Sequence, residues 1–280
     1  MSAVILAVVL AAASSGQVTA TPDETDRKEQ QAYMKERAAE LTLSRGPAAN
    51  QPLTLTAEPV LRYSNAERDI GALDGLTFLW LAKERPVAAV SLSVRRMNNQ
   101  VYHELTSFSD EPLECRRGET ALWSPKAGGL LAQPLADAPS PAAGKPQRLA
   151  QMRSLARGFT ANCHHPRTDE PTELRLLTQP LYRYADEQGK IVDGAIFAFV
   201  VSNDPELFLI LEAVRAQADA EPQWRYSLAR MSSHKETVRL DGKEVWSVPN
   251  YYSDPTEDRK TGPYIEARVG VFSPRNAPLE

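Results

Sequence analysis

The sequence predicts a mostly β protein of the α+β class, built from two tandem pseudo-repeats of an antiparallel β meander. Short apolar runs follow the two-residue period of half-buried strands, as in "VAAVSLSV" over residues 87–94. Two long stretches resemble each other in the same order, and each closes with a hairpin pattern. Each copy alone is small enough to be marginally stable, so we expect one joint sheet, sandwich or barrel.

The internal resemblance covers residues 59–125 and 180–249, with a nearly constant numbering offset. The matched residues include Arg62-Tyr63 with Arg183-Tyr184, Asp74-Gly75 with Asp193-Gly194, Pro86 with Pro205, Leu105 with Leu228, and Trp123 with Trp246. Strands share apolar patterns by convergence, which is the alternative explanation. Because Arg, Tyr and Asp-Gly also match, the series predicts an internal duplication.

The chain outside the repeats divides into four segments. Residues 1–20 carry an apolar run that is too short to span a bilayer, followed by small residues, as in a signal peptide. We therefore expect export to the periplasm or the extracellular space, although a buried strand or helix is the alternative. Since no second apolar run of spanning length follows, we expect a soluble mature chain with no membrane span. The other segments are a helix and linker (21–58), a Pro/Ala-rich connection with a helix (126–179), and a C-terminal loop and strand (250–280).

Two helices are expected, one before the first repeat and one between the repeats. Thr21 and Glu24 form a capping box for the first, and Gly46-Pro47 ends it. The second is expected over residues 146–160. Their apolar stripes are Met34, Ala38 and Leu41 in the first helix, and Leu149, Met152, Leu155 and Phe159 in the second.

A hairpin is expected at the end of each repeat. Asp241-Gly242 is a strong two-residue turn pattern, and Gly118 occupies the corresponding turn of the first repeat. The second strand of each hairpin then carries a tryptophan, and "YIEARVGVF" adds one strand near the C-terminus.

Composition and motifs exclude several classes of function. With a net charge of −4, nucleic acid is not an expected partner, because phosphate binding needs a basic surface. The sequence lacks a P-loop, a dinucleotide fingerprint, an EF-hand loop and the common hydrolase motifs, so no cofactor is expected. The pairing of Ser232–Lys235 ("SSHK") with "KTG" is a weak match to serine penicillin-binding enzymes, because the two motifs lie too close together.

The segment "NCHHP" (162–166) is the one concentration of metal-ligand residue types. A tetrahedral site needs three or four ligands, and this spacing does not resemble a known zinc pattern. We expect a polar loop and no metal site. Cys115 and Cys163 are the only cysteines, and in an exported protein they would be able to form a disulfide. Since Cys115 aligns with Val238, the alternative is a small buried residue.

Six polar residues occur in both repeats and are candidate ligand-binding residues. They are Arg62, Tyr63, Asp74, Arg183, Tyr184 and Asp193. On one interpretation they form two equivalent sites, or one site on a pseudo-two-fold axis. On the other, Asp-Gly makes a turn, and Arg-Tyr packs its stems on the sheet while its polar ends stay wet. We favour the second interpretation.

Taken with these motifs, the segments "LRYSNAERD", "DGLTFLWL", "QMRSLAR", "PLYRYADEQG" and "EVWSVP" resemble uncharacterised exported proteins of planctomycete-type bacteria. The resemblance implies export and a bacterial origin, and it implies no activity and no catalytic residues. Two hypotheses of function follow. The first is a non-catalytic exported module that binds a ligand or a protein partner. The second is a hydrolase whose site is dispersed in the sequence, using His103 or His234 with carboxylates.

Overall fold

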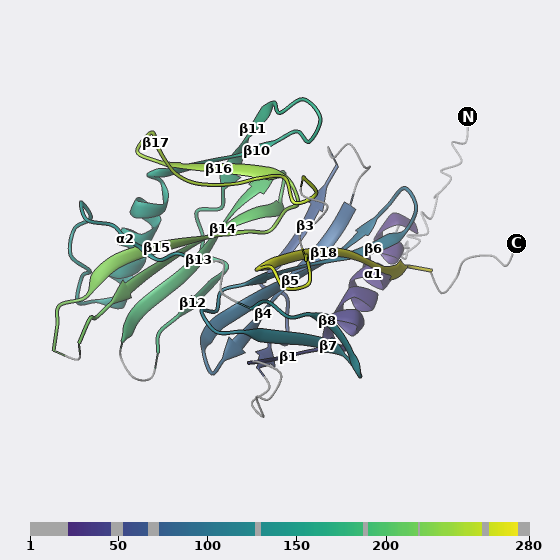
Figure 1. The fold of residues 1–280 in the computed structure, drawn as a ribbon, viewed down its shortest axis with the longest axis horizontal. Helices are drawn as coiled ribbons and strands as arrows, with labels where there is room; N and C mark the ends of the chain where they lie inside the picture. Colours follow the sequence, from purple (N-terminus) through teal and green to yellow (C-terminus); the bar gives the residue numbers. More distant parts are fainter. Residues whose placement is uncertain are drawn as a thin grey trace, which may run out of the picture.

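The computed structural model describes residues 22–45, 53–66, 73–126, 130–186, 190–217, 219–253 and 258–273. Within these ranges the chain is mostly antiparallel strand with two helices, which confirms the predicted fold class (Figure 1). The predicted signal peptide lies outside the described residues.

The chain forms two units with the same order of elements, one helix followed by eight strands. Unit 1 comprises α1 (Pro22–Ala39), β1 (Leu41–Arg45), β2 (Thr54–Leu55), β3 (Leu61–Asn65), β4 (Leu73–Ala82), β5 (Arg85–Arg95), β6 (Gln100–Ser107), β7 (Leu113–Arg117) and β8 (Thr120–Trp123). Unit 2 comprises α2 (Lys145–Ala156), β10 (Phe159–His164), β11 (Pro171–Leu176), β12 (Tyr182–Tyr184), β13 (Ile191–Val201), β14 (Asp204–Val214), β15 (Gln223–Arg230), β16 (Lys235–Leu240) and β17 (Lys243–Val248). The matching segments are therefore longer than the predicted repeats, since each includes its own helix and the two strands that follow it.

The central hairpins of the two units have the same register. Trp80 pairs with Ala88 in β4–β5, and Phe199 pairs with Leu207 in β13–β14; each pair is followed by a register shift. The turn residues Lys83 and Ser202 have φ values of 57° and 55°. A shared bulge and a shared left-handed turn residue at one numbering offset are backbone features that apolar patterning alone does not produce.

The closing hairpins also match, as the turn patterns predicted. Cys115 pairs with Trp123 in β7–β8, and Val238 pairs with Trp246 in β16–β17, again with a register shift beside each pair. Gly118, Asp241 and Gly242 adopt positive φ in the two turns. Both tryptophans lie on the second strand of their hairpin.

The predicted helix ends were wrong in both units. Leu41 and Phe159 were expected on helical stripes, but α1 ends at Ala39 and α2 at Ala156, and both residues lie in the next strand. Each is still buried, because a strand placed under the helix keeps its side chain in the same core. β2 and β10–β11 were also missed, since they lie within the segments predicted as linker and connection.

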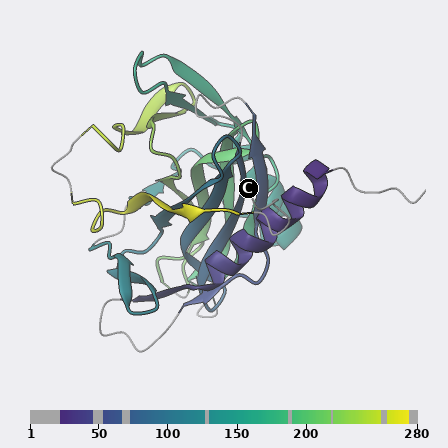
Figure 2. The same ribbon diagram turned by 90° about the vertical axis from the view of Figure 1, so that its right-hand side faces the viewer.

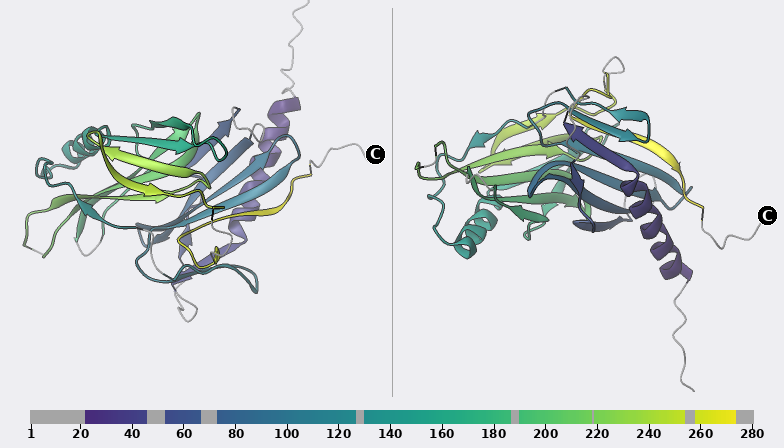
Figure 3. Two further views of the ribbon diagram at one scale, coloured as in Figure 1. Left: turned by 45° about the horizontal axis from the view of Figure 1, so that its top comes forward. Right: turned by 90° about the horizontal axis from the view of Figure 1, so that it is seen from below.

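Each helix packs against the central hairpin of its own unit: α1 on β4 and β5, and α2 on β13 and β14. The fully buried helix residues are Met34 and Ala38 in α1, and Met152 and Ala156 in α2, at the same positions in the two units. The helices lie at opposite ends of the molecule, and α1 crosses the outer side of the unit 1 strands (Figures 2 and 3). The helix between the predicted repeats therefore belongs to the second unit.

The chain after each unit adds a strand to the other unit. β9 (Gln133–Pro134), which follows unit 1, pairs with β15 of unit 2. β18 (Tyr264–Val271), which follows unit 2, pairs with β6 of unit 1 and lies beside it in Figure 1. This exchange is reciprocal, because β6 and β15 occupy the same place in their units.

Three hydrophobic clusters hold the fold together. One lies beneath α1 and one beneath α2. Each is built mainly from a single unit, with additions from β18 in the first and from Leu135 and Ala138 of the connecting segment in the second. The third joins the opposite faces of the two central hairpins, with Leu79 and Ala89 from unit 1 and Ile196, Phe208 and other residues from unit 2. Within it, the rings of Phe108 and Phe208 pack edge to face with centroids 5.9 Å apart. The units thus share the joint core that their small size predicted.

Candidate functional site

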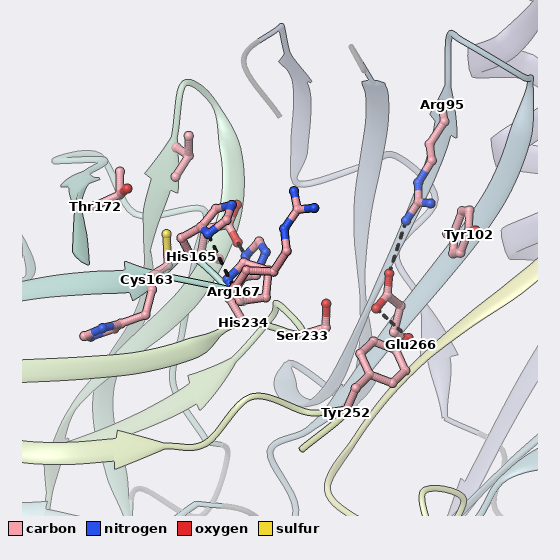
Figure 4. Close-up of a pocket in the computed structure, with 14 residues that line it drawn as sticks. Arg95, Tyr102, Cys163, His165, Arg167, Thr172, Ser233, His234, Tyr252 and Glu266 are labelled. Atoms are coloured by element: carbon pink, nitrogen blue, oxygen red, sulfur yellow. Dashed lines mark hydrogen bonds and ion pairs between the residues drawn. The ribbon is translucent and has the colours of Figure 1, made fainter. Parts of the chain in front are cut away.

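A cavity of about 770 Å³ lies at the junction of the two units. The residues that line it are Arg95, Tyr102, Tyr252 and Glu266 on one side, and Cys163, His164, His165, Pro166, Arg167, Thr172, Val201, Glu206, Ser233 and His234 on the other. The two groups face each other across the cavity in Figure 4. Its volume is within the range of small-molecule sites.

Arg95 is held in place on the unit 1 side. It lies at the end of β5, where its guanidinium carbon is 3.7 Å from the centroid of the Tyr102 ring. Its Nη2 is 3.6 Å from a carboxylate oxygen of Glu266 on β18. The hydroxyl of Tyr252 donates to the same carboxylate at 2.9 Å. Burial and the adjacent Glu266 charge raise the pKa of Tyr252 above its usual value, so this hydroxyl keeps its proton at neutral pH.

His164 and His165 lie where β10 ends and its tight connection to β11 begins. The backbone N–H of His165 donates to the Glu170 carbonyl at 2.9 Å, which closes the turn. Nε2 of His164 is 3.3 Å from the Thr237 hydroxyl, and its Nδ1 is 3.4 Å from a carboxylate oxygen of Asp169. Nδ1 of His165 accepts from the backbone N–H of Thr168 at 3.2 Å. The predicted polar loop is therefore partly strand, and its histidines form one wall of the cavity.

His234 is the predicted hydrolase candidate that the structure places in the cavity. Its Nδ1 lies 3.9 Å from a carboxylate oxygen of the buried Glu206 and 3.3 Å from the Ser232 hydroxyl. A catalytic triad needs the acid on one ring nitrogen and the nucleophile on the other. Here both approach the same nitrogen, and Ser232 is fully buried and accepts the backbone N–H of His234. The arrangement does not form a serine triad.

The equivalent junction on the other side of the units is nearly closed. A cavity of about 40 Å³ lies there, lined among others by Asp110, Arg225 and Ala132. By the registers above, these positions correspond to Ser233, Tyr102 and Glu266 of the large cavity. The connecting segment closes this junction, with Leu130 packed against the shared core. One of two equivalent junctions is therefore open and the other is filled.

Arg183 and Asp193 form a buried ion-pair network rather than a ligand site. Asp193 is 2% exposed and accepts hydrogen bonds from Nε of Arg183 and Nε of Arg148 on α2, both at 2.8 Å. Arg148 also donates to the carbonyls of Ala142 and Ala143. The three charges attach α2 and the chain before it to β12 and β13.

Tyr63 and Tyr184 each lie across the glycine that follows the matched aspartate. Tyr63 pairs with Gly75, and Tyr184 pairs with Gly194, inside antiparallel ladders. The expected Asp-Gly turns were therefore wrong, because Asp74-Gly75 lies within β4 and Asp193-Gly194 lies within β13. Glycine is needed at each position because a tyrosine ring covers its Cα, where a Cβ atom would clash. The two tyrosines are buried, so their hydroxyls are not exposed to solvent, contrary to the expectation. That of Tyr184 donates to the Glu212 carboxylate at 2.8 Å.

Arg62, which is exposed, and Asp74, which is half-buried, pair with other residues of unit 1. Arg62 is paired with Glu58 at 3.6 Å, and Glu58 with Lys35 of α1 at 2.7 Å. Asp74 accepts from Arg96 at 2.6 Å. None of the six matched residues lines the large cavity, and their contacts favour the framework interpretation.

His103, the other hydrolase candidate, lies inside unit 1. It is 2% exposed and does not line the cavity. Burial, together with the charge of Arg117, lowers the pKa of His103 to about 4. This histidine is therefore neutral at physiological pH and out of reach of a substrate.

The cysteines are not joined by a disulfide. Both are buried, Cys115 in the cluster beneath α1 and Cys163 in the cluster beneath α2. Of the two possibilities that the sequence left open, the structure has the small buried residue and not the disulfide, because the two side chains belong to the cores of different units. Among the described residues, no group of three or more His, Cys, Asp or Glu side chains is arranged to hold a metal ion.

Sequence reasoning missed most of the cavity-lining residues, including Arg95, Tyr102, Arg167, Glu206 and Glu266. The resemblance between the two units contains a usable indication. Glu206 and His234 stand where the first unit has Val87 and Glu111, so they are departures from the shared framework. Comparing the two units for differences, rather than for identities, indicates the open junction.

No protein-family model, curated protein or solved structure matches this chain at a significant level. In the described part of the chain, none of the helices combines the length and the apolar character needed to cross a membrane.

Proposed function

We propose that this protein is a non-catalytic binding protein whose small ligand occupies the cavity between the two units. The observation that carries the proposal is the asymmetry of the junctions: one is filled by the connecting segment, and the other holds about 770 Å³. A binding site on the pseudo-two-fold scaffold needs only one open junction. Three of the four histidines in the chain line the open junction, and a packing defect with no binding role does not require them.

The test is a thermal denaturation screen of the purified protein against a panel of small polar metabolites, because a ligand that binds the folded state raises the melting temperature. Val201→Trp fills the cavity from the end of β13. Ala82→Trp is the matched control, since it stands at the corresponding position of β4 away from the cavity. We expect stabilising ligands that act on the wild type and on Ala82→Trp and not on Val201→Trp. A panel with no stabiliser, or stabilisers unaffected by Val201→Trp, contradicts the proposal.

A hydrolase is the second candidate, and the closeness of His234 to Glu206 within the cavity favours it. Mass spectrometry of each stabilising compound after incubation distinguishes the two. Unchanged compounds support binding alone. Conversion that is lost in His234→Gln supports the hydrolase and contradicts the non-catalytic proposal.

We also propose that the chain is exported and that its two units arose by duplication of one unit. The apolar N-terminal segment and the resemblance to exported planctomycete-type proteins support export. The matched registers, bulges and reciprocal tail strands support duplication of a unit that once paired with a second copy of itself. Expression of the full chain in a bacterium with cell fractionation tests export: we expect a mature protein outside the cytoplasm that begins at Thr21. An intact chain retained in the cytoplasm contradicts it.

A further inference from the structure

The charges around the cavity differ from those of the chain as a whole. The chain has a net charge of −4, yet the lining holds two arginines and three histidines against two glutamates. The arginines stand on opposite walls, Arg95 on unit 1 and Arg167 on unit 2, and Figure 4 shows them on either side of the cavity. Two separated cationic positions suit a ligand with two separated acidic groups.

Arg95 is organised in advance for such a ligand. Stacking on Tyr102 and the contact with Glu266 fix the plane of its guanidinium. The planar fork of arginine then offers donors to a phosphate, sulfate or carboxylate without much further loss of side-chain freedom. Glu266 does not repel the ligand with a full charge, because Arg95 and the Tyr252 hydroxyl both contact it.

The opposite wall holds three histidines among charged neighbours. Its histidines are His164, His165 and His234, and histidine is the side chain that exchanges its proton between about pH 5 and 8. Charged groups surround them. They are Arg167, Asp169 and Glu170 from the β10–β11 turn, Glu206, Arg230, Lys235 and Glu236 from β14 to β16, Arg95 from β5 and Glu266 from β18. Lys235 neutralises Asp169 at 2.8 Å. Opposite charges thus nearly cancel at neutral pH, and protonation of the histidines leaves an excess of positive charge.

We infer that the cavity binds a small molecule with two acidic groups, one held at Arg95 and the other at the Arg167–histidine wall, and that it binds this molecule more tightly as the pH falls. The inference rests on the proposed function and names its ligand class. The affinity rises on acidification because the bound anion favours the charged form of each histidine.

Isothermal titration with a naphthalene disulfonate tests the inference, because the charge of this probe is constant over the pH range used. We expect binding about tenfold tighter near about pH 5.5 than near about pH 7.5 at fixed ionic strength. Arg95→Gln lowers the affinity about tenfold or more at both pH values, since a charged hydrogen bond is lost. Arg95→Lys keeps part of the affinity. Arg96→Gln is the matched control, because the adjacent Arg96 pairs with Asp74 outside the cavity.

His165→Gln and His234→Gln together are expected to reduce the pH dependence of binding, leaving only the part that His164 contributes. Equal affinity for a naphthalene diamine, or an Arg95→Gln variant that binds as the wild type does, overturns the inference. If the disulfonate does not bind while Val201→Trp still abolishes binding of a ligand from the metabolite panel, the anion inference fails and the proposed function stands. If Val201→Trp affects no ligand, both fail.

Discussion

The ring of Tyr184 lies across Gly194: a Cβ atom on that glycine would stand 2.7 Å from Cζ of the tyrosine. The ring is fixed there because it is 6% exposed and its hydroxyl donates to Glu212. Tyr63 and Gly75 repeat the arrangement in unit 1. Tyr63 and Tyr184, which were candidate ligand-binding residues in the sequence, are therefore packed against glycines of the framework.

Gly194→Ala should lower the free energy of unfolding by about 1–3 kcal/mol, because the added methyl group displaces a packed ring. Gly270→Ala is the control. A Cβ there meets nothing closer than 3.6 Å, so its stability should stay close to that of the wild type. Urea unfolding measures both variants. If Gly194→Ala is as stable as the wild type, the Tyr184 ring moves aside freely and is not fixed against Gly194.

Asp193→Asn should cost about 3–5 kcal/mol, because it leaves the buried Arg148 without its counter-charge. Asp74→Asn changes the matched aspartate of unit 1, which pairs instead with the 33% exposed Arg96, and should cost at most about 1 kcal/mol. Chemical denaturation compares the two. Similar losses for both variants contradict the structural role given to Asp193.

His103 should make stability depend on pH. Burial lowers its pKa from 6.5 to about 4, so between these values the unfolded chain binds a proton that the folded chain does not. Stability is then complete above pH 6.5 and falls by up to about 3 kcal/mol as the pH drops towards 4. Urea unfolding at a series of pH values should show a weaker dependence for His103→Leu than for the wild type. The half-buried His165→Gln serves as the control, and an unchanged slope in His103→Leu contradicts a buried neutral histidine.

Cys115 should resist thiol reagents in the native protein, because burial raises the pKa of its thiol to about 12. Unfolding without a reductant should expose two reactive thiols, counted with an aromatic disulfide reagent and located by mass spectrometry. Cys115→Val, which introduces the residue that unit 2 has at the corresponding Val238, should keep the native fold. If the unfolded chain shows no reactive thiol until a reductant is added, the cysteines are bonded, against the separate burial described above.

Much of the fold was determined by the sequence alone. The alternating apolar pattern predicted the strands, and Asp241-Gly242 and Gly118 predicted the closing hairpins. The matched residues predicted two similar units, because the same residue types at the same spacing favour the same local backbone geometry. The helix ends escaped because Leu41 and Phe159 continue a helical apolar period across the helix end into the next strand. The local spacing of apolar residues does not distinguish the end of a helix from the start of a strand that keeps the same side buried.

The tertiary structure decided the site. Arg95 and Arg167 are distant in the chain, and only the packing of the two central hairpins brings their elements to one junction. It also decided which junction is open, because the connecting segment with Leu130 fills the other. The identities between the two units marked the framework, which local strand geometry sets. The cavity results from non-local packing at positions where the two units differ, so the sequence determined the scaffold and the tertiary contacts determined the site.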